Sequence, residues 1–254
     1  MTGRLAIIGL GPGAPELVTP QASEALAGAT DLVGYAPYLY RVPERAGQRR
    51  HASDNREEIA RARQALDLAA SGRNVAVVSS GDPGIFAMAS ATFEAIETGK
   101  PEWRDIEVTV IPGVSAMLAA AARVGAPLGH DFCVLSLSDN LKPWETVLAR
   151  LEAAGAADLV IVLYNAASKA RPWQLGEAIR AVARHRAATT PVIFARAVSQ
   201  ADERIEITQL ADADAASADM RTLIIVGSST TKLVPMSAGA SFVYTPRHAE
   251  LVTL

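Results

Sequence analysis

The chain has 254 residues, of which 50% are hydrophobic and 20% charged, so it can bury one large core or two modest ones. Its formal net charge of −3 gives no overall attraction to nucleic acid or to an anionic membrane. A single cysteine, Cys133, excludes an internal disulfide, and with only four histidines it argues against a protein metal site.

The N-terminal half alternates short apolar runs with Ala-rich stretches of helical character. Strands are expected at 4–9, 31–34, 74–79 and 107–111, and helices at about 20–28, 55–71 and 85–97. This alternation is typical of an α/β domain built on a parallel sheet.

The C-terminal half repeats the alternation. Strands are expected at 132–137, 159–164, 191–195, 204–208 and 221–227, the last two as a hairpin across a polar loop. We place the domain junction near residue 113, which predicts two α/β domains, 1–113 and 114–254. The tail from Pro235 is rich in small residues and is expected to lie over the surface or to reach a neighbouring chain.

The location of the protein is predicted from its apolar segments. Met1 is followed by a strand-like run instead of a charged segment and an apolar stretch. The longest apolar runs, such as 158–164, are far shorter than the roughly 20 residues of a membrane span. We therefore expect a cytoplasmic protein with neither a membrane nor a nucleic acid as its partner.

Three glycine-containing turns carry most of the functional information. They occupy residues 9–13, 79–86 and 112–116, and each directly follows an apolar, strand-like run. In open α/β sheets ligands bind at the carboxyl ends of the strands. The turns therefore predict one cleft for a small molecule, and hence an enzyme.

A dinucleotide site is the obvious alternative for the first turn, because residues 9–14 fit the loose G-x-G-x-x-G/A pattern. However, Pro12 and Pro15 remove backbone amides that a pyrophosphate would need. The second strand also ends in Gly34-Tyr35 instead of the acid that binds ribose. A nicotinamide-dependent oxidoreductase is thus disfavoured, and a nucleoside without a phosphate bridge fits better.

Together with Glu16-Leu17-Val18-Thr19, the three turns resemble those of the tetrapyrrole methylase family, and the resemblance spans about residues 4–230. The stretches 34–39, 136–144 and 163–171 are similar to the branch of this family that acts on C17 of precorrin-3B. The resemblance implies two α/β domains with a cofactor cleft between them, usually within a homodimer.

The resemblance further implies an enzyme that uses S-adenosylmethionine, releases S-adenosylhomocysteine, and has an acidic tetrapyrrole as substrate. The expected reaction is methylation of C17 of precorrin-3B with ring contraction to precorrin-4, in aerobic cobalamin biosynthesis. Two alternatives stay open: the corresponding reaction on cobalt-factor III in the anaerobic pathway, and a non-catalytic tetrapyrrole carrier.

The cofactor supplies an already activated methyl group, so the protein has mainly to position it. Gly81 and Gly84 permit close approach, and Asp82 can accept amide hydrogen bonds or offset the sulfonium charge. Asp82 fits a cap of the helix after Pro83 equally well, and the pair at 164–165 fits a simple strand end. By resemblance, the cofactor-contacting positions are Pro12, Gly81, Asp82, Ser115, Ala116, Tyr164, Asn165, Ala195, Gly227 and Ser228.

The carboxylates of the substrate require cations and a broad apolar surface. Residues 41–51 hold four arginines and a histidine against one glutamate, which favours carboxylate capture by the cluster. Any single arginine there is equally typical of a solvated surface. The substrate-binding candidates are Arg41, Arg45, Arg49 and Arg50, with Lys169 and Arg171 after the turn at 164–165.

Ring contraction is expected to expel C20 as an acetyl group, and loss of the proton of its hydroxyl would drive that migration. A general base is therefore plausible. The candidates are Asp82, His130 and Asp139, with Ser80 and Asp131 as further possibilities. His130, beside Gly129, fits a loop histidine bonded to backbone equally well, and the sequence does not identify the base.

Overall fold

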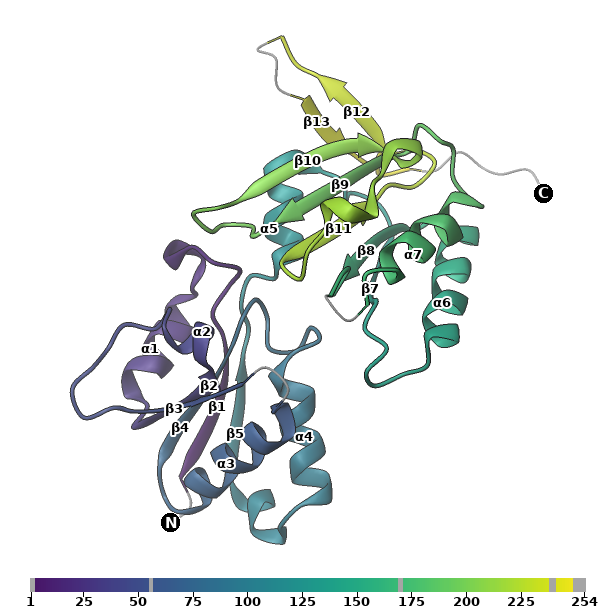
Figure 1. Ribbon diagram of the computed structural model, residues 1–254. Helices are drawn as coiled ribbons and strands as arrows, with labels where there is room; N and C mark the ends of the chain where they lie inside the picture. The colour runs from purple at the N-terminus through teal and green to yellow at the C-terminus, as the bar shows by residue number, and fades with distance from the viewer. Residues whose placement is uncertain (1–2, 55–56, 169–170, 238–240, 249–254) are drawn as a thin grey trace. The chain divides into compact units, whose positions relative to one another are not determined.

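A computed structural model describes residues 3–54, 57–168, 171–237 and 241–248, and the chain divides into two compact units, Met1–Ala116 and Met117–Leu254 (Figure 1). Each unit has its own five-stranded sheet. The expected α/β architecture is confirmed, whereas the roles assigned to the domains 1–113 and 114–254 stay predictions.

The N-terminal unit alternates strands with helices. Its strands are β1 (Arg4–Gly9), β2 (Asp31–Tyr35), β3 (Arg49–Ser53), β4 (Asn74–Ser79) and β5 (Glu107–Ile111). Its helices are η1 (Pro15–Leu17), α1 (Pro20–Gly28), α2 (Ala36–Leu39), α3 (Glu58–Ala70), α4 (Met88–Thr98) and η2 (Pro101–Asp105). Four of the strands fall where the apolar runs predict them.

The five strands are all parallel, in the order β3-β2-β4-β1-β5. Side chains of β1 alternate between two cores: Leu5 and Ile7 pack with α3 and α4, and Ile8 packs with α1 and α2. Figure 1 shows these helix pairs on opposite faces of the sheet. Both faces are therefore buried, which explains the near-continuous apolar runs of the central strands.

The strand order identifies where this sheet offers a binding crevice. Strands β4 and β1 are neighbours in the sheet. The connection from β1 crosses β4 to reach β2, whereas the connection from β4 crosses β1 to reach β5. The connections from β1 and β4 therefore run toward opposite ends of the sheet. Such a switch point opens a crevice at the carboxyl ends of the strands, where the turns at 9–13 and 79–86 lie.

The C-terminal unit begins with α5 (Ala116–Val124), whose first residue is the last residue of the N-terminal unit. Its strands are β6 (Gly125–Ala126), β7 (Phe132–Ser136), β8 (Val160–Tyr164), β9 (Pro191–Arg196), β10 (Arg204–Gln209), β11 (Thr222–Val226), β12 (Lys232–Pro235) and β13 (Ser241–Tyr244). Its other helices are α6 (Trp144–Ala156), α7 (Gln174–Ala183), η3 (Leu210–Asp212) and η4 (Ala215–Ser217).

The main sheet of this unit is mixed, in the order β10-β9-β11-β8-β7. Because β11 runs antiparallel to both its neighbours, β7, β8 and β9 share a direction and their carboxyl ends share an edge. The predicted hairpin of β10 with β11 is wrong. Strand β9 lies between them and pairs with both, and the hairpin in this region is formed by β9 and β10 across residues 197–203.

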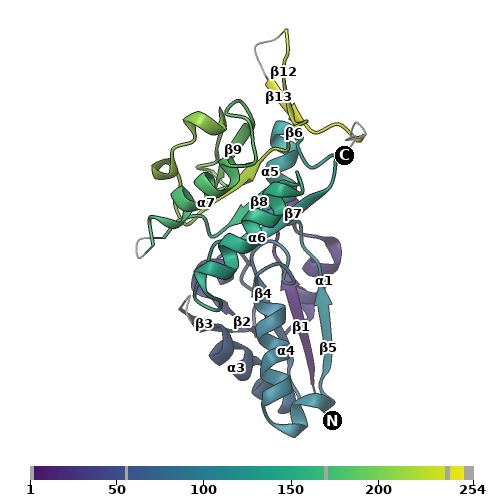
Figure 2. The same ribbon diagram turned by 90° about the vertical axis from the view of Figure 1, so that its right-hand side faces the viewer.

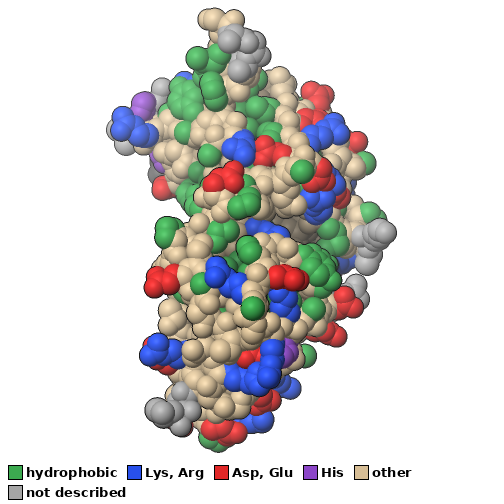
Figure 3. All heavy atoms as spheres, turned by 90° about the vertical axis from the view of Figure 1, so that its left-hand side faces the viewer, with side chains coloured by type: hydrophobic (Ala, Val, Ile, Leu, Met, Phe, Trp, Pro, Cys, Tyr) green, Lys and Arg blue, Asp and Glu red, His purple; other side chains and the backbone are tan. Residues whose placement is uncertain are grey.

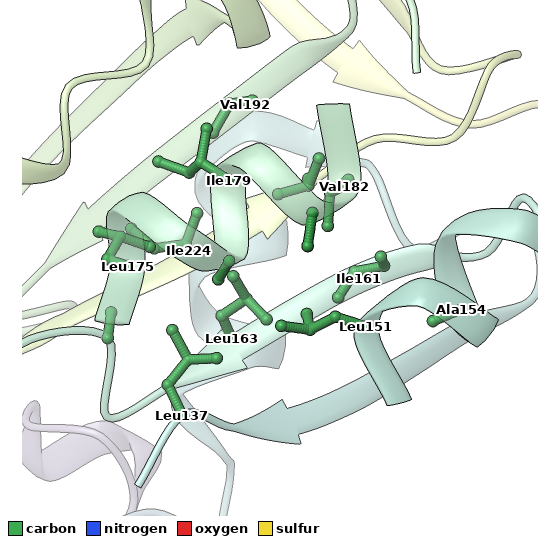
Figure 4. Packing of buried hydrophobic residues seen from close by; sticks show 14 of the residues in the cluster. Leu137, Leu151, Ala154, Ile161, Leu163, Leu175, Ile179, Val182, Val192 and Ile224 are labelled. Atoms are coloured by element: carbon green, nitrogen blue, oxygen red, sulfur yellow. The ribbon is translucent and has the colours of Figure 1, made fainter. Parts of the chain in front are cut away.

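The core of this unit is built where α6 and α7 cover one face of the sheet. Figure 4 shows Leu151 of α6 and Val182 of α7 directed toward Ile161 and Leu163 of β8. All four side chains are buried. Burial of each such side chain contributes roughly 1.5–3 kcal/mol, so this cluster holds β8, and the turn that follows it, in place.

A small third sheet joins the end of the chain to the residues after α5. Strand β12 pairs with β13, and β13 pairs with β6. Figures 1 and 2 show the β12–β13 hairpin extending away from the main sheet of its unit. Leu233, Met236 and Phe242 are exposed on it, so part of the predicted tail forms a strand with apolar side chains facing outward.

The outer surface carries both signs of charge. On the face in Figure 3, Lys and Arg side chains alternate with Asp and Glu instead of forming one continuous basic area. Within the described ranges no helix is long and apolar enough to span a membrane. Nor does any group of three His, Cys, Asp or Glu side chains there gather as metal ligands.

A buried carboxylate anchors the amino end of the N-terminal sheet. Asp31 has no exposed surface and accepts hydrogen bonds from Arg73, Thr30 and the Nε2 of His51. Burial alone would raise the pKa of the Asp31 carboxyl, but the bonds from His51, Thr30 and Arg73 outweigh burial and lower it. The ionised form therefore stabilises the fold.

We predict that Asp31→Asn lowers the free energy of unfolding by about 2 kcal/mol, because His51 and Arg73 lose their acceptor. In the wild type this contribution is present above the ordinary carboxyl pKa of about 4 and is lost as pH falls through the lower folded value. Urea unfolding at neutral and acidic pH measures both effects. Glu24→Gln, at an exposed carboxyl of α1, is the control, and equal pH slopes for the wild type and Asp31→Asn would contradict the assignment.

Candidate functional site

The first two glycine turns are joined by backbone hydrogen bonds at the switch point. The amide of Leu10 donates to the Ser79 oxygen at 2.8 Å. Gly11 and Gly81 exchange two bonds, 2.9 Å from the Gly81 nitrogen and 3.2 Å from the Gly11 nitrogen. Both glycines have positive φ, +67° and +62°, a conformation that residues with a side chain rarely adopt.

The third turn packs against the first two with no room for side chains. A Cβ added at Gly9 would lie 2.6 Å from the Gly81 oxygen and 2.7 Å from the Gly113 nitrogen. A Cβ at Gly113 would lie 2.2 Å from the same oxygen. These distances are shorter than van der Waals contact, so the three turns require glycine to meet.

Asp82 links the second turn to the third. Its Oδ1 accepts a hydrogen bond from the Gly84 amide at 2.8 Å, and its Oδ2 accepts one from the Gly113 amide at 3.1 Å. The predicted acceptance of nearby amides is confirmed. The alternative of a cap for a helix directly after Pro83 is wrong, because α4 begins only at Met88 and has no side-chain cap.

An open space and an unpartnered polar group lie close together at Gly81. A Cβ at Gly81 would meet only Ser115 Cα at 3.7 Å and Ala116 N at 3.8 Å. Ser115 is buried, and its Oγ has no hydrogen-bond partner in the described structure. Such an orphaned hydroxyl is costly. Pro12, also buried, lies in the first turn of the same edge.

The four arginines of residues 41–51 do not gather at one place. Arg41 bonds to the turns at the carboxyl edge. Arg49 begins β3 and therefore lies at the opposite, amino edge of the parallel sheet. Arg50 donates to two backbone oxygens, while Arg45 is exposed in the loop before β3. Carboxylate binding by these residues stays a prediction.

In the C-terminal unit the corresponding edge is formed by the ends of β7 and β8. The Asn165 amide donates to Ser136 Oγ at 2.8 Å, and Asn165 has a positive φ of +54°. The Tyr164 hydroxyl accepts a hydrogen bond from the Met117 amide at 3.1 Å. Met117 directly follows Ala116 in the chain, so Tyr164 fixes the residue next to the third turn.

Asp139 and Arg171, predicted in different roles, form an ion pair at this edge. The hydrogen bond from Arg171 lowers the pKa of the Asp139 carboxyl, which makes it a weaker base near neutral pH. The pair joins the loop after β7 to the segment before α7. Lys169, the neighbouring substrate candidate, lies outside the described residues.

Three other predicted residues lie at the far edge of the mixed sheet. Gly227 and Ser228 follow β11, whose end is aligned with the start of β8, about 13 Å along the strand from Tyr164. His130 precedes β7 at that same far edge, and its Nδ1 accepts the Asp131 amide at 2.7 Å. The structure therefore does not bring these three residues together with Tyr164.

Ala195, near the end of β9, is at the same edge of the sheet as Tyr164 and is fully buried.

Two exposed apolar residues escaped the sequence analysis. Phe86 follows the second turn with a positive φ of +50° and is 54% exposed. Leu141, in the loop after β7, is 98% exposed. The positive φ of Phe86 depends on tertiary structure and could not be predicted from the sequence. Leu141, in contrast, is an apolar residue within a polar loop, and this pattern could have identified it. Strained backbone of this kind is concentrated at functional sites.

Comparisons with known proteins define the class of this fold and site. Residues 4–214 match the model of the tetrapyrrole (corrin/porphyrin) methylases. The chain belongs to this family, and it is a methyltransferase of the α/β type that the sequence predicted.

Within the family, the chain is 54% identical over 247 residues to the precorrin-3B C(17)-methyltransferase of a Sinorhizobium species, covering 97% of both chains. It is 42% identical to the probable cobalt-factor III C(17)-methyltransferase of Salmonella typhimurium, covering 89% of this chain and 93% of the relative. The crystal structure of the methyltransferase CobJ superposes with a TM-score of 0.91 at 48% identity, covering 96% of this chain and all of that one.

We predict that Gly81→Ala weakens binding of S-adenosylhomocysteine at least tenfold while the protein stays folded. No protein atom lies closer than 3.7 Å to the added methyl, so the methyl would occupy ligand space, and at a φ of +62° it also strains the turn that holds the ligand. Gly47→Ala is the control, because Gly47 also has positive φ (+80°) but precedes β3, at the amino edge. If calorimetry gave equal affinities for the two variants, the assignment of the ligand site to Gly81 would be contradicted.

Proposed function

We propose that this methyltransferase transfers the methyl group of S-adenosylmethionine to C17 of precorrin-3B and contracts the ring to precorrin-4, a step of cobalamin biosynthesis. The observation that carries the cofactor part is the joined set of glycine turns beside the unpartnered Ser115 hydroxyl. The substrate part is supported by the 54% identity to an enzyme of that name.

When bound, S-adenosylmethionine would supply a methyl group carried on a positively charged sulfur. The electron pair of the broken sulfur–methyl bond would stay on the sulfur, and C17 would provide the pair for the new carbon–carbon bond. The chain has to hold the two reactants in line. The open space at Gly81 and the Ser115 hydroxyl receive the cofactor, and Asp82 fixes the turn between them. Tyr164 and Asn165, at the carboxyl edge of the C-terminal sheet, are further candidates for polar contact with the cofactor.

The macrocycle requires an apolar surface with cations around it. Phe86 and Leu141 offer exposed apolar side chains at the carboxyl edges of their respective sheets. Arg171 and the exposed Arg45 are the candidate partners of its carboxylates. Arg49 begins β3 at the opposite edge of its sheet, so it is not proposed as a partner of a ligand beside Phe86. Arg171 already pairs with Asp139, so a substrate carboxylate would share or replace that acid.

For ring contraction we propose Asp82 as the general base. When the base takes the C20 hydroxyl proton, the O–H electron pair becomes the carbonyl bond of the acetyl group. The ring carbon bonded to C20 then migrates with its bonding pair to C1, and the pair displaced at C1 departs with a leaving group of the substrate. Asp82 lies in the second turn, and a carboxylate keeps free lone pairs after accepting two amides. Asp139 is weakened by Arg171, and His130 is at the far edge of its sheet.

The proposal includes a homodimer located in the cytoplasm. The exposed apolar side chains of the β12–β13 hairpin support a contact with a second copy. Family membership and the composition of the chain support the location.

The reaction is tested by incubating the protein with isotopically labelled S-adenosylmethionine and either precorrin-3B or cobalt-factor III, followed by mass spectrometry of the tetrapyrrole. We expect one labelled methyl and the contracted ring with precorrin-3B, together with release of S-adenosylhomocysteine. Turnover of cobalt-factor III alone would select the second substrate, in line with the 42% identical relative. No release of S-adenosylhomocysteine with either tetrapyrrole would contradict the proposed reaction.

The same assay tests the base. We expect Asp82→Asn to accumulate C17-methylated product with an uncontracted ring, because the amide cannot take the hydroxyl proton. His130→Ala and Asp139→Asn are run in parallel. Contracted product at the wild-type rate from Asp82→Asn, or accumulation from either of the other variants alone, would contradict the assignment.

A further inference from the structure

Arg41 joins the first two glycine turns through its guanidinium group. One terminal nitrogen donates to the oxygens of Leu10 at 2.7 Å and Gly11 at 2.9 Å. The other donates to the Ser80 hydroxyl at 3.3 Å. Leu10 and Gly11 belong to the turn after β1, and Ser80 directly precedes Gly81 in the turn after β4. A single side chain from a third segment therefore bonds to both turns.

The planar guanidinium suits this task better than other cations. Its nitrogens are spread in a rigid fork, so it can bond to two carbonyls and a hydroxyl at once, whereas an ammonium is a point charge. The Arg41 Nε is buried without a partner in the described structure. The fold thus leaves one donor unsatisfied, which costs free energy, while both terminal nitrogens are used on the turns.

Arg50 in turn fixes the backbone from which Arg41 projects. One of its terminal nitrogens donates to the Leu39 oxygen at 2.8 Å and the other to the Val42 oxygen at 2.7 Å. These carbonyls lie on either side of Arg41 in the chain, at the end of α2. Arg50 sits on β3, so the paired strands of the sheet hold Arg41 indirectly.

The charge of Arg41 has no acidic partner within ion-pair distance in the part of the chain that the structure describes. Burial lowers the pKa of its guanidinium, but that of an arginine stays far above neutrality. The cation is therefore retained, and it is directed at backbone oxygens of the turns. An arginine free to capture a substrate carboxylate would instead keep its terminal donors open.

We propose that Arg41 is a positioning residue for methyl transfer, which fixes the first glycine turn against the second, and that Arg50 holds Arg41 in that place. The inference rests on the proposed function, because it takes these turns as the cofactor site. It assigns two of the clustered arginines to the cofactor side of the reaction instead of to the carboxylates of the substrate.

The test measures S-adenosylhomocysteine affinity by calorimetry for the wild type, Arg41→Ala, Arg41→Lys, Arg50→Ala and the control Arg63→Ala at an exposed position of α3. We expect Arg41→Ala and Arg50→Ala to bind on the order of tenfold more weakly, equivalent to about 1.4 kcal/mol. The affinity of Arg41→Lys should lie between those of the wild type and Arg41→Ala, because lysine keeps the charge and one or two of the hydrogen bonds. If Arg41→Ala does not fold, Arg41→Lys serves as the folded variant. Arg63→Ala should match the wild type.

Steady-state kinetics with both substrates separates positioning from carboxylate capture. We expect the KM for S-adenosylmethionine to rise and kcat to fall in the Arg41 variants, with the KM for the tetrapyrrole changed less than twofold. Wild-type cofactor affinity in folded Arg41→Lys and Arg50→Ala, with a raised KM for the tetrapyrrole, would overturn the inference. If the wild type itself bound no S-adenosylhomocysteine, the proposed function would fail instead.

Discussion

The close packing of three peptide segments is the constraint on which the candidate site depends. Gly9, Gly81 and Gly113 end or follow three different strands, and a Cβ on the first or the last would lie 2.2–2.9 Å from backbone atoms of the other turns. The order of the sheet brings β4, β1 and β5 side by side, and glycine lets their turns touch. Two side chains stabilise this packing. Asp82 accepts a hydrogen bond from the Gly113 amide of the third turn, and Arg41 donates to the Leu10 oxygen of the first turn.

The strands that form the cores were predictable from sequence because burial on both faces leaves a continuous apolar run. β3 was missed for the converse reason. Its sequence, Arg49 to Ser53, is polar, and as the edge strand it pairs on one side only. The false hairpin of β10 and β11 has another cause: in a mixed sheet, adjacency along the chain does not decide which strand is inserted between two others.

The candidate site was predictable to the extent that it consists of turns directly after strands. Glycine and proline mark such turns in the sequence, which is why residues 9–13, 79–86 and 112–116 stood out. Turn residues do not reveal the direction of a strand. Gly227 and Ser228, assigned by resemblance, and His130, considered as a base, therefore could not be placed from the sequence, and they lie at the opposite edge of the sheet from Tyr164. The partners of a long side chain are equally hidden, and the carbonyls bound by Arg41 and Arg50 emerged only from the fold.

Hydrogen exchange of backbone amides, followed by mass spectrometry with and without S-adenosylhomocysteine, tests most directly which segments of the chain bind the cofactor. Slower exchange is expected in peptides covering residues 80–86, 113–117 and 164–166 when the ligand is present, because ligand contact suppresses local opening. Peptides covering 128–131 and 227–231, at the far edge of the second sheet, should be unchanged. Protection confined to those far-edge peptides, with binding established independently, would contradict the account.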